Sequence, residues 1–471
     1  MERIHIGLIG FGTVGTGLVR ILQQNAKLLE ERLGLSIVLK RIADLDIVRD
    51  RGVKVNPAIL TTRVAEVLDD PEISIVAELM GGLDPARSFI LQAIEKGKHV
   101  VTANKALLAV HGGEIFAAAE EKGVEIGFEG SVGGGIPIIR SLKEGLVANR
   151  IQVMFGILNG TSNYILTEMT NQKQKFQEVL KRAQELGYAE ADPTLDVEGI
   201  DTAHKLAILL SLAYGVNVKM EDIYTEGISS ITPMDIEYAK ELGYTIKLLA
   251  IAKADGGAVE ARVHPTLLPA DHLLATVGGP FNAIFVKGDA VGSTMFYGAG
   301  AGMMPTGSAV VSDLVDICRN IRVGVSRRVP LLSYQRNHRR EAEIKNIQDI
   351  SCTYYLRFTV VDRPGVLSRI SGILGDVDIS IASVIQKGRR VEKAVPIYVV
   401  THEAREKDMQ KALQVIGFAK SRENNDGFVK GQLWRCVSTS SLQKVGAARR
   451  AARYRATRRV APTIGFARLA W

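Results

Sequence analysis

The sequence predicts an α/β protein in which a doubly wound parallel sheet is followed by an α+β segment and a small β-α-β unit. Short apolar runs alternate with amphipathic stretches through residues 1–135, a pattern typical of parallel strands joined by helical crossovers. After residue 136 the alternation gives way to longer helical and strand-like runs. A separate β-α-β pattern begins near residue 351.

The first segment contains five apolar runs that we expect to be strands: IHIGLIG, IVLKRIA, ISIVAEL, HVVTA and VEIGF. Helical stretches fall between them, at 13–33, 85–97 and 112–122. At roughly 100–200 residues per domain, a chain of 471 residues is long enough for two to four domains. We therefore assign residues 1–135 to a first domain with a nucleotide-fold pattern.

The later segments differ in pattern. Residues 136–300 combine strand-like QVMFGIL, AVEARVHPTLL and AIFVKG with helical stretches at 174–187 and 200–214. The helix predicted at about 300–322 is expected to return to the first domain and complete it. The charged segment 323–350 is interpreted as a linker, and residues 351–416 as a third domain.

Positive charge is concentrated at the C-terminal end. The chain has a net charge of +8, but residues 417–471 hold 12 Lys and Arg against 2 Asp and Glu, so the rest of the chain is close to neutral. Two hypotheses remain for this tail: a basic arm, or an altered C-terminus that was never selected to fold. The abrupt change in composition favours the second, and we expect residues 417–471 to be disordered. A nucleic-acid partner would rest on this tail alone, and we do not expect one.

Other classes are excluded by composition. No apolar run reaches the roughly 18–20 residues that a spanning helix needs, and MERIHIGLIG enters a strand without a signal-peptide pattern. We therefore expect a cytoplasmic protein without a membrane partner. The three cysteines, Cys318, Cys352 and Cys436, lie far apart without metal-ligand spacing, so neither a disulfide framework nor a zinc site is predicted.

A glycine-rich turn predicts a dinucleotide site of the Rossmann type. Gly10, Gly12 and Gly15 follow the first strand and open a helix, as a G-x-G-x-x-G motif requires. The second strand ends in Arg41-Ile42-Ala43-Asp44, where an acid holds a ribose diol and a basic group can hold a 2′-phosphate. Cofactor choice is therefore open between NAD and NADP. We favour NADP with Arg41 on the phosphate, while a solvated surface arginine remains the alternative.

Two lysines and an aspartate are candidate catalytic residues. Lys105 follows a strand, so it should lie at the carboxyl edge of the sheet, although an exposed loop lysine fits the position equally well. Asp201 and Lys205 are four residues apart in a predicted helix and share one face. Spacing alone favours a surface ion pair over a general acid and base.

Several motifs together resemble the homoserine dehydrogenase family of the monofunctional type with a C-terminal ACT domain. These are GFGTVG, VVTANKALLA, FEGSVGGGIPIIRSL, GILNGTSNYIL, LGYAEADPTLDVEGIDTAHKL and GAGAGMMPTGSAVVSDLVDI, in order over residues 1 to about 320. The resemblance implies interconversion of L-homoserine and L-aspartate 4-semialdehyde with NAD(P), in threonine and methionine biosynthesis. It also implies that residues 136–300 bind substrate and form a homodimer or a larger homo-oligomer.

The resemblance assigns roles to individual residues. Lys205 would transfer the proton, Asp201 would be its partner and a substrate ligand, and Glu190 would bind the substrate amino group. Lys105 would contact both cofactor and substrate. Asn159 lies in a loop expected near the substrate, while Asp192 and Asp196 are expected to support rather than catalyse. The cofactor would be lined by Phe11, Thr13, Val14, Thr102 and Gly302.

The resemblance further implies a monovalent cation, sodium, held mostly by backbone carbonyl groups. By motif position these belong to Glu129, Val132, Gly134 and Ile136 of EGSVGGGI. Composition alone would not reveal such a site, because backbone carbonyls occur at every residue.

Residues 354–415 resemble an ACT domain with a ferredoxin-like fold. VVDRPGVL is the strand-to-helix turn at which such domains bind an amino acid, which in this family implies feedback inhibition by threonine. The domain should end in a strand after a helix at 403–416, yet the chain enters the basic tail. We therefore expect an incomplete sheet, with threonine regulation in question. The alternative to an enzyme is a non-catalytic amino-acid sensor that uses the ACT module.

Overall fold

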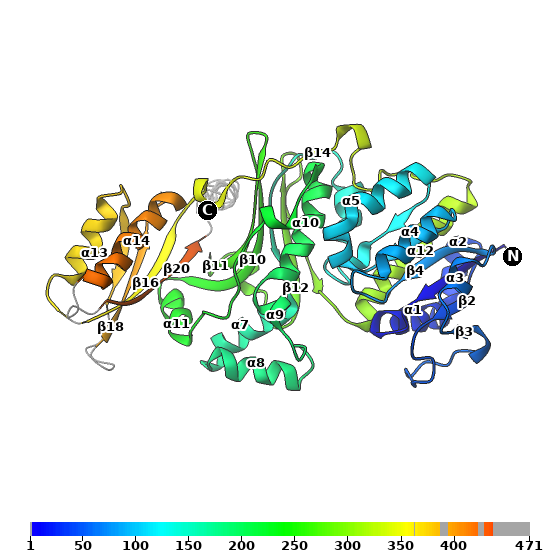
Figure 1. The fold of residues 1–471 in the computed structure, drawn as a ribbon, viewed down its shortest axis with the longest axis horizontal. Coiled ribbons are helices and arrows are strands. Elements are labelled where there is room, and N and C mark those ends of the chain that lie inside the picture. Colours follow the sequence, from blue (N-terminus) through cyan, green and yellow to red (C-terminus); the bar gives the residue numbers. More distant parts are fainter. Residues whose placement is uncertain (1, 362, 387–393, 423–427, 437–471) are drawn as a thin grey trace, which may run out of the picture. The chain divides into compact units, whose positions relative to one another are not determined.

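The computed structural model describes residues 2–361, 363–386, 394–422 and 428–436 (Figure 1). The chain divides into two compact units after Ile350, and each is described by itself. Within the described residues, no helix is both long and apolar enough to cross a membrane.

The N-terminal part of the first unit is a parallel sheet. Its strands are β1 (Arg3–Ile9), β2 (Ser36–Ala43), β3 (Leu60–Thr61), β4 (Ile73–Glu78), β5 (His99–Thr102) and β6 (Ile126–Gly127), in the order β3-β2-β1-β4-β5-β6. The connecting helices are α1 (Thr13–Gln24), α2 (Ala26–Leu33), α3 (Ala65–Leu68), α4 (Ala86–Glu95) and α5 (Lys105–Lys122). The strand order reverses between β1 and β4, which is where open α/β sheets bind their ligands. The predicted doubly wound sheet is therefore confirmed.

The middle of the chain is an antiparallel sheet with helices. Its strands are β7 (Ile151–Ile157), β10 (Tyr244–Asp255), β11 (Ala258–Pro269), β12 (Phe281–Gly288) and β13 (Gly292–Ala299), in the order β13-β12-β7-β10-β11. The helices are α6 (Ile138–Arg140), α7 (Gly160–Gln172), α8 (Phe176–Glu185), α9 (Thr194–Val197), α10 (Ile200–Tyr214) and α11 (Pro233–Glu241). Two short strands, β8 (Val216–Asn217) and β9 (Tyr224–Thr225), complete this region.

Helix α10 lies at the centre of the first unit. It packs against α5 on one side and against β10 on another, so most of its residues are buried (Figure 1). A helix surrounded by protein is apolar on all sides, which explains the run LAILLSLA. Any charged side chain on its buried faces must therefore be paired.

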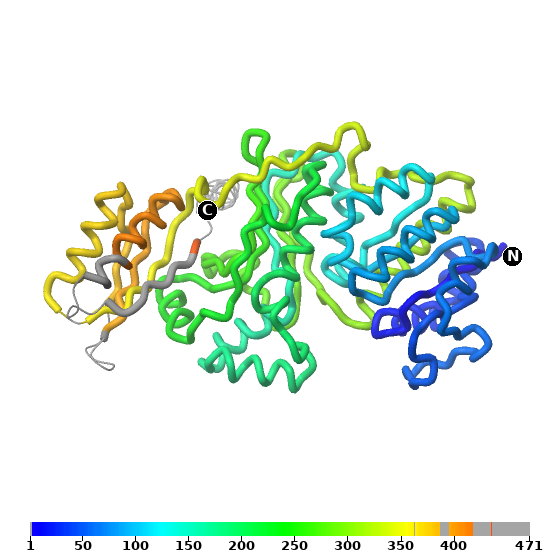
Figure 2. Tube along the Cα trace, in the orientation of Figure 1, coloured from blue at the N-terminus to red at the C-terminus, as the bar shows by residue number. Residues whose placement is uncertain are grey.

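Helix α12 (Met303–Arg322) packs against α1, although the two helices are far apart in the sequence (Figure 2). The two helices approach closely because glycines meet at the contact. A Cβ at Gly17 would lie 2.0 Å from the Met303 carbonyl oxygen, and one at Gly307 would lie 2.8 Å from the Gly17 carbonyl carbon. Val310, Leu314 and the buried, free Cys318 join the core of the parallel sheet.

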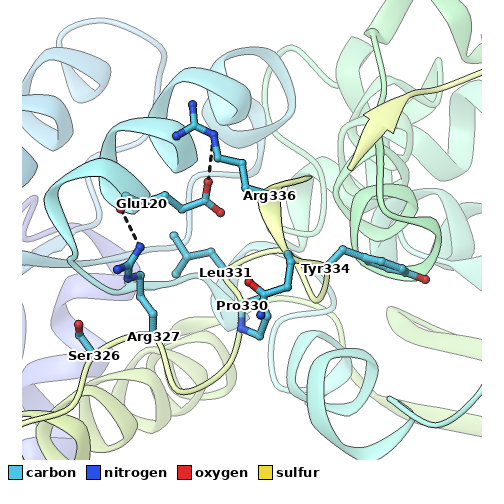
Figure 3. Close-up of a pocket in the computed structure, with 8 residues that line it drawn as sticks. Glu120, Ser326, Arg327, Pro330, Leu331, Tyr334 and Arg336 are labelled. Atoms are coloured by element: carbon cyan, nitrogen blue, oxygen red, sulfur yellow. Dashed lines mark hydrogen bonds and ion pairs between the residues drawn. The ribbon is translucent and has the colours of Figure 1, made fainter. Parts of the chain in front are cut away.

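The segment 323–350 follows the surface of the first unit. Its strand β14 (Arg340–Glu341) pairs with β8, and the Lys345 backbone N–H donates to the Val259 carbonyl oxygen at 2.9 Å. Arg327 donates to the Glu120 carbonyl oxygen at 2.7 Å. A surface pocket of about 400 Å³ lies between this segment and α5 (Figure 3). Glu120 is near the end of α5, so the pocket is roughly 20 Å from Lys105 at the start of the helix.

Among its described residues, the second unit consists of a four-stranded antiparallel sheet with two helices. Its elements are β16 (Tyr354–Val361), α13 (Val366–Gly375), β17 (Ile381–Ile385), β18 (Ala394–Thr401), α14 (Glu406–Arg422) and β20 (Phe428–Cys436), with short strands β15 (Ser351–Cys352) and β19 (Ala404–Arg405). The strand order β20-β16-β18-β17 is that of a ferredoxin-like fold. The predicted class of this domain is therefore confirmed.

The expectation of an incomplete sheet is wrong. Helix α14 continues to Arg422, and β20 pairs with β16. Both elements extend into residues 417–471, the basic tail that was expected to be disordered. The positive charge of the segment was misleading because Arg435 is not solvated: it is 3% exposed and binds Glu406, which also accepts a hydrogen bond from Tyr354. The rest of the predicted disordered tail, 437–471, lies outside the described residues.

Candidate active site

The glycine turn leaves an open space at the start of α1. Gly10 has a φ of 95°, and a Cβ there would lie 2.5 Å from the Met80 backbone nitrogen. A Cβ at Gly15 would lie 2.3 Å from the Gly10 carbonyl oxygen. At Gly12, by contrast, a Cβ would have no neighbour within 4 Å. Gly10 and Gly15 thus shape the turn, while Gly12 keeps the helix N-terminus accessible to a phosphate group.

The residues beside the turn include a carboxylate, which can bind ribose hydroxyl groups, and guanidinium groups, which can bind a phosphate. The Phe11 backbone N–H donates to Asp44 at 2.5 Å, and Arg51 binds Asp44 at 3.2 Å while its guanidinium covers the Phe11 ring at 4.7 Å. Arg41 instead donates to the Ala58 carbonyl oxygen at 2.8 Å. Arg51 could not be predicted from the sequence because it lies in a loop, where its spacing from the strand does not indicate its position.

Three further predicted cofactor residues lie around α1 and α12. Thr13 is exposed in the first turn of α1, and Val14 behind it packs against the core of the sheet. Gly302 has a φ of 124° and caps α12, which packs on α1.

A buried network joins the carboxyl ends of β4 and β5. The Thr102 hydroxyl donates to Glu78 at 2.8 Å, and Asn104 caps α5 while donating to the Gly82 carbonyl oxygen at 2.6 Å. Burial raises the pKa of the Glu78 carboxyl group. Glu78 was also missed in the sequence, because a lone acid after an apolar strand has no distinctive spacing. The network fixes Asn104 and therefore the start of α5, where Lys105 stands.

Lys105, Asp201 and Lys205 form one charged cluster. Asp201 Oδ2 accepts from Lys205 Nζ at 2.6 Å, and Asp201 Oδ1 lies 3.3 Å from Lys105 Nζ. Lys205 Nζ also donates to the Leu158 carbonyl oxygen at 2.7 Å. Asp201 is 5% and Lys205 is 8% exposed, whereas the Lys105 side chain is 42% exposed. The pair on α10 is therefore not the surface ion pair that spacing alone favours.

The electrostatics of the cluster follow from its burial. Although burial tends to raise the pKa of Asp201, the ammonium groups of Lys205 and Lys105 lower it to about 2. Asp201 is therefore a carboxylate at any physiological pH. Its charge stabilises the Lys205 ammonium, and the arrangement can bring one proton-carrying nitrogen to a buried position.

Asn159 connects the cluster to a second acid. It caps α7 and donates to Asp201 at 2.9 Å and to Asp196 at 2.7 Å. Burial, together with the nearby Asp201 carboxylate, raises the pKa of Asp196. Glu190 is exposed, as is Asp192, whose carboxylate accepts a hydrogen bond from the neighbouring Thr194.

The loop proposed to hold a cation approaches the loop before α12. Gly133 and Gly134 have φ values of 73° and 55°, and a Cβ at Gly134 would lie 2.6 Å from the Gly300 carbonyl carbon. The Glu129 carboxylate accepts from the backbone N–H groups of Ile139 and Arg140, and the Glu129 backbone N–H donates to Asp313 of α12 at 2.8 Å. No cluster of three acidic, histidine or cysteine side chains occurs among the described residues, so side chains alone do not form a metal site there.

A glycine turn at the switch point of a parallel sheet, with a buried lysine and aspartate beside Lys105 after the carboxyl end of β5, is typical of a nucleotide-dependent oxidoreductase. Comparison with known families agrees. The family described as homoserine dehydrogenase, NAD binding domain, matches residues 10–129, and that described as homoserine dehydrogenase matches residues 137–315. The ACT domain family matches residues 354–418.

Relatives and solved structures agree with the family matches. Homoserine dehydrogenase from Pseudomonas aeruginosa is 47% identical over 419 residues, covering 88% of this chain and 96% of the relative. The crystal structure of a homoserine dehydrogenase from Thiobacillus denitrificans is 48% identical with a TM-score of 0.86, covering 93% and 99% of the two chains. A hyperthermophilic archaeal homoserine dehydrogenase in complex with NADPH is 25% identical with a TM-score of 0.57, covering 67% and 98%.

The chain therefore belongs to the homoserine dehydrogenase family, an NAD(P)-dependent oxidoreductase family. The resemblance that the sequence motifs predict is confirmed, as is the prediction of an enzyme over a non-catalytic sensor. An ACT domain is present, but it accompanies a complete pair of catalytic and nucleotide-binding regions.

Proposed function

We propose that the cluster of Lys105, Asp201 and Lys205 carries out the proton chemistry of L-homoserine and L-aspartate 4-semialdehyde interconversion. The observation that supports this most directly is the 2.6 Å contact between Lys205 and Asp201 at a buried position. NAD(P) bound at the glycine turn supplies the hydride in one direction and accepts it in the other. The open space at Gly12 and the accessible N-terminus of α1 fit the pyrophosphate of such a cofactor.

Lys205 is the proposed proton donor and acceptor. An ammonium group has three N–H bonds, and Leu158 and Asp201 take two of them, leaving one for the substrate oxygen. During reduction the ammonium stabilises the developing alkoxide and protonates it. During oxidation a neutral Lys205 accepts the hydroxyl proton, so the oxidation rate should increase toward alkaline pH.

Substrate binding is assigned to Lys105, Asp201 and Glu190. Lys105 is the most exposed member of the cluster and suits a substrate carboxylate or carbonyl group. Asp201 keeps its negative charge and can bind a cationic group through the oxygen that faces Lys105. Glu190 is proposed to bind the substrate amino group, in line with its place in the family motif and its exposure.

NADP is the proposed cofactor, with Arg51 on the 2′-phosphate. Arg51 stands beside Asp44 at the end of β2, where the adenosine ribose is bound in this type of sheet. Arg51 also donates to the Phe11 and Arg49 carbonyl oxygens, and its side chain is 10% exposed. Arg41 donates to the Ala58 carbonyl oxygen and is 30% exposed, so Arg41 remains the alternative phosphate ligand. The remaining lining is assigned to Phe11, Thr13, Val14, Thr102, Lys105 and Gly302.

A sodium ion is proposed at the carbonyl groups of Glu129, Val132, Gly134 and Ile136. Hard cations prefer oxygen ligands, and the positive φ values of Gly133 and Gly134 allow the tight turn of this loop. The ion would bind the loop that meets Gly300, next to the start of α12. Activity in sodium, potassium and tetramethylammonium buffers tests this proposal, because a carbonyl site of fixed size should discriminate among the three cations.

Assembly and regulation are proposed from the family. The chain is expected to form a homodimer or a larger homo-oligomer, which light scattering of the purified protein measures. Threonine is proposed as an allosteric inhibitor that binds the ACT domain, whose sheet contains all four strands of its fold. Loss of activity on addition of threonine, without competition with homoserine, supports this role.

The experiment for the proposed function is a spectrophotometric assay. The purified protein is mixed with L-homoserine and NADP or NAD at alkaline pH, and absorbance at 340 nm is followed. We expect cofactor reduction that falls by about 10²–10⁴-fold in Lys205→Ala, mainly in kcat. Glu190→Ala should mainly raise the KM for homoserine. No reduction by a folded protein that binds NADPH would contradict the substrate assignment.

A further inference from the structure

We infer that Asn159 is a positioning residue for the reaction, and that its side-chain amide fixes the Asp201 carboxylate by bridging it to Asp196. The inference rests on the proposed roles of Asp201 and Lys205. Asn159 follows β7 and caps α7, and it is 5% exposed.

Both ends of the Asn159 amide are in use. Its Oδ1 accepts from the Ser162 backbone N–H at 2.8 Å, which is the helix cap. Its Nδ2 donates to Asp196 Oδ1 at 2.7 Å and to Asp201 Oδ2 at 2.9 Å. An amide nitrogen carries two N–H bonds, so each carboxylate receives one of them. One side chain thus joins the start of α7 to α9 and α10.

The bridge determines which way Asp201 faces. Asp201 Oδ2 accepts from both Asn159 and Lys205, so its other oxygen is turned toward Lys105, the most exposed member of the cluster. Without the amide, only Lys205 would hold Oδ2, and the carboxylate could rotate about χ2. A misplacement of about 1 Å can cost roughly 10²-fold in rate. Asn159 therefore acts on the reaction through Asp201 rather than by touching the substrate.

Asparagine suits this position because its side-chain amide is uncharged. The charged and titratable groups around the bridge are Asp196 on α9, Asp201, Lys205 and the half-buried His204 on α10, and Lys105 on α5. Two carboxylates bound to one donor nitrogen repel each other less than if they met directly, because each contacts a partial positive charge. Only an amide provides an acceptor for the helix and two donors for the acids without adding a charge.

The Asn159→Asp variant tests the bridge to the two aspartates independently of the helix cap. Aspartate also caps helices, so the contact to Ser162 is kept while both donors are lost. In this variant a protonated carboxyl group can still donate one O–H bond to a neighbouring carboxylate, whereas an ionised one donates none and adds a third negative charge. The defect should therefore grow as pH rises. A role confined to capping α7 would not produce a pH-dependent defect.

The test compares Asn159→Asp and Asn159→Ser with wild type and with Asn346→Asp. Asn346 is an exposed cap whose oxygen accepts from Gln348, so it undergoes the same chemical change away from the site. kcat and KM for homoserine oxidation are measured from pH 6.5 to 10, with the thermal midpoint of each variant. We expect Asn159→Asp to lose about tenfold in kcat at pH 7 and about 10²-fold at pH 9.5, with the KM for NADP within twofold.

Asn159→Ser, which retains a capping oxygen without the added charge, should lose about tenfold at every pH, and Asn346→Asp should match wild type. An Asn159→Asp defect that is constant with pH, or smaller than threefold, overturns the inference. If Asn159→Asp fails to fold, Asn159→Ser decides: activity within twofold of wild type overturns the inference, and a tenfold loss in kcat at an unchanged thermal midpoint supports it. Wild-type protein that fails to oxidise homoserine would instead overturn the proposed function itself.

Discussion

Asp201 and Lys205 have a spacing that is common in surface ion pairs, and it is their burial that makes them a candidate catalytic pair. Four residues along a helix place two side chains on one face, and this much is visible in the sequence. Their burial comes from α5 and β10, which cover α10 from distant parts of the chain. A buried pair must be satisfied on all sides, and here Leu158, Asn159 and Lys105 complete it.

The Asp201 pKa predicts how stability depends on pH. The folded-state pKa of about 2 lies below the ordinary value of 3.8, so the carboxylate contributes stability that is present above about pH 4 and is lost as the pH falls through 2. Asp201→Asn should therefore lower the free energy of unfolding by about 2 kcal/mol at pH 7. Urea unfolding at pH 7 and at pH 3 measures this, and the difference between the two proteins should shrink at the lower pH. An equal difference at both would contradict the origin assigned to it.

Arg51 gives a prediction for cofactor choice. If its guanidinium binds the 2′-phosphate, Arg51→Ala should raise the KM for NADP by about 10-fold or more and change that for NAD much less, since a charged hydrogen bond contributes roughly 1.5–3 kcal/mol. Arg41→Ala is measured beside it, because Arg41 is the alternative phosphate ligand at the end of the same strand. Steady-state kinetics with both cofactors decides, and a larger effect on NADP at Arg41 would reverse the assignment.

Which site residues could be predicted depends on whether local order identifies them. Gly10, Gly12 and Gly15 were identifiable because a strand, a turn and a helix follow one another directly. Arg51 and Glu78 were not, because the first reaches the turn from a loop and the second is defined by its burial beside β5. The family resemblance supplied the roles of Lys205 and Glu190, which residue spacing could not.

At the scale of elements, the β1-α1 turn contains glycines of two kinds: Gly15 has no room for a side chain, whereas Gly12 faces open space. Gly15→Ala places a Cβ 2.3 Å from the Gly10 carbonyl oxygen, so it should lower the thermal midpoint. Gly12→Ala meets nothing within 4 Å, so it should fold normally but raise the KM for the cofactor by occupying the space for its phosphates. Thermal unfolding and kinetics of the two variants check this pair. A destabilised Gly12→Ala with normal cofactor binding would exclude a phosphate at that space.

Elements with a regular pattern were predicted well, and those defined by pairing were not. Five of the six strands of the parallel sheet stand out as apolar runs between helices, whereas the two-residue strand β3 does not. Strand β20 did not stand out, because its basic residues resemble those of the segment that follows it. Only its pairing with β16 and the buried contact of Arg435 with Glu406 distinguish it.

At the scale of the whole molecule, the Arg435 and Glu406 pair is a test of how far the second unit extends. Burial tends to raise the pKa of Glu406, but Arg435 lowers it below its ordinary value. Arg435→Met should leave a buried charge unpaired and cost the unit about 3–5 kcal/mol. Denaturant unfolding measures the loss, and the double variant Arg435→Met/Glu406→Gln should recover much of it. Wild-type stability in Arg435→Met would contradict the placement of β20.

The residues of the proposed reaction and those of the proposed regulation lie in different units. Every residue of the proposed site lies before Ile350, and the sheet expected to bind threonine lies after it. The fold class of both could be predicted from the sequence, since each repeats a pattern of strands and helices that is local in sequence, although β20 was not predicted. The geometry of the proposed site could not be predicted from the sequence, because α5, α7, α9 and α10 come together only in the folded structure.

The most direct test of the account is the pH dependence of kcat/KM for homoserine oxidation in wild type and in Lys205→Ala. If the Lys205 and Asp201 pair moves the proton, the wild-type value rises with pH, while Lys205→Ala is slower by about 10²-fold or more and loses that rise. A Lys205→Ala protein that keeps the same rise with pH would show that another group accepts the proton, and the central claim would be wrong.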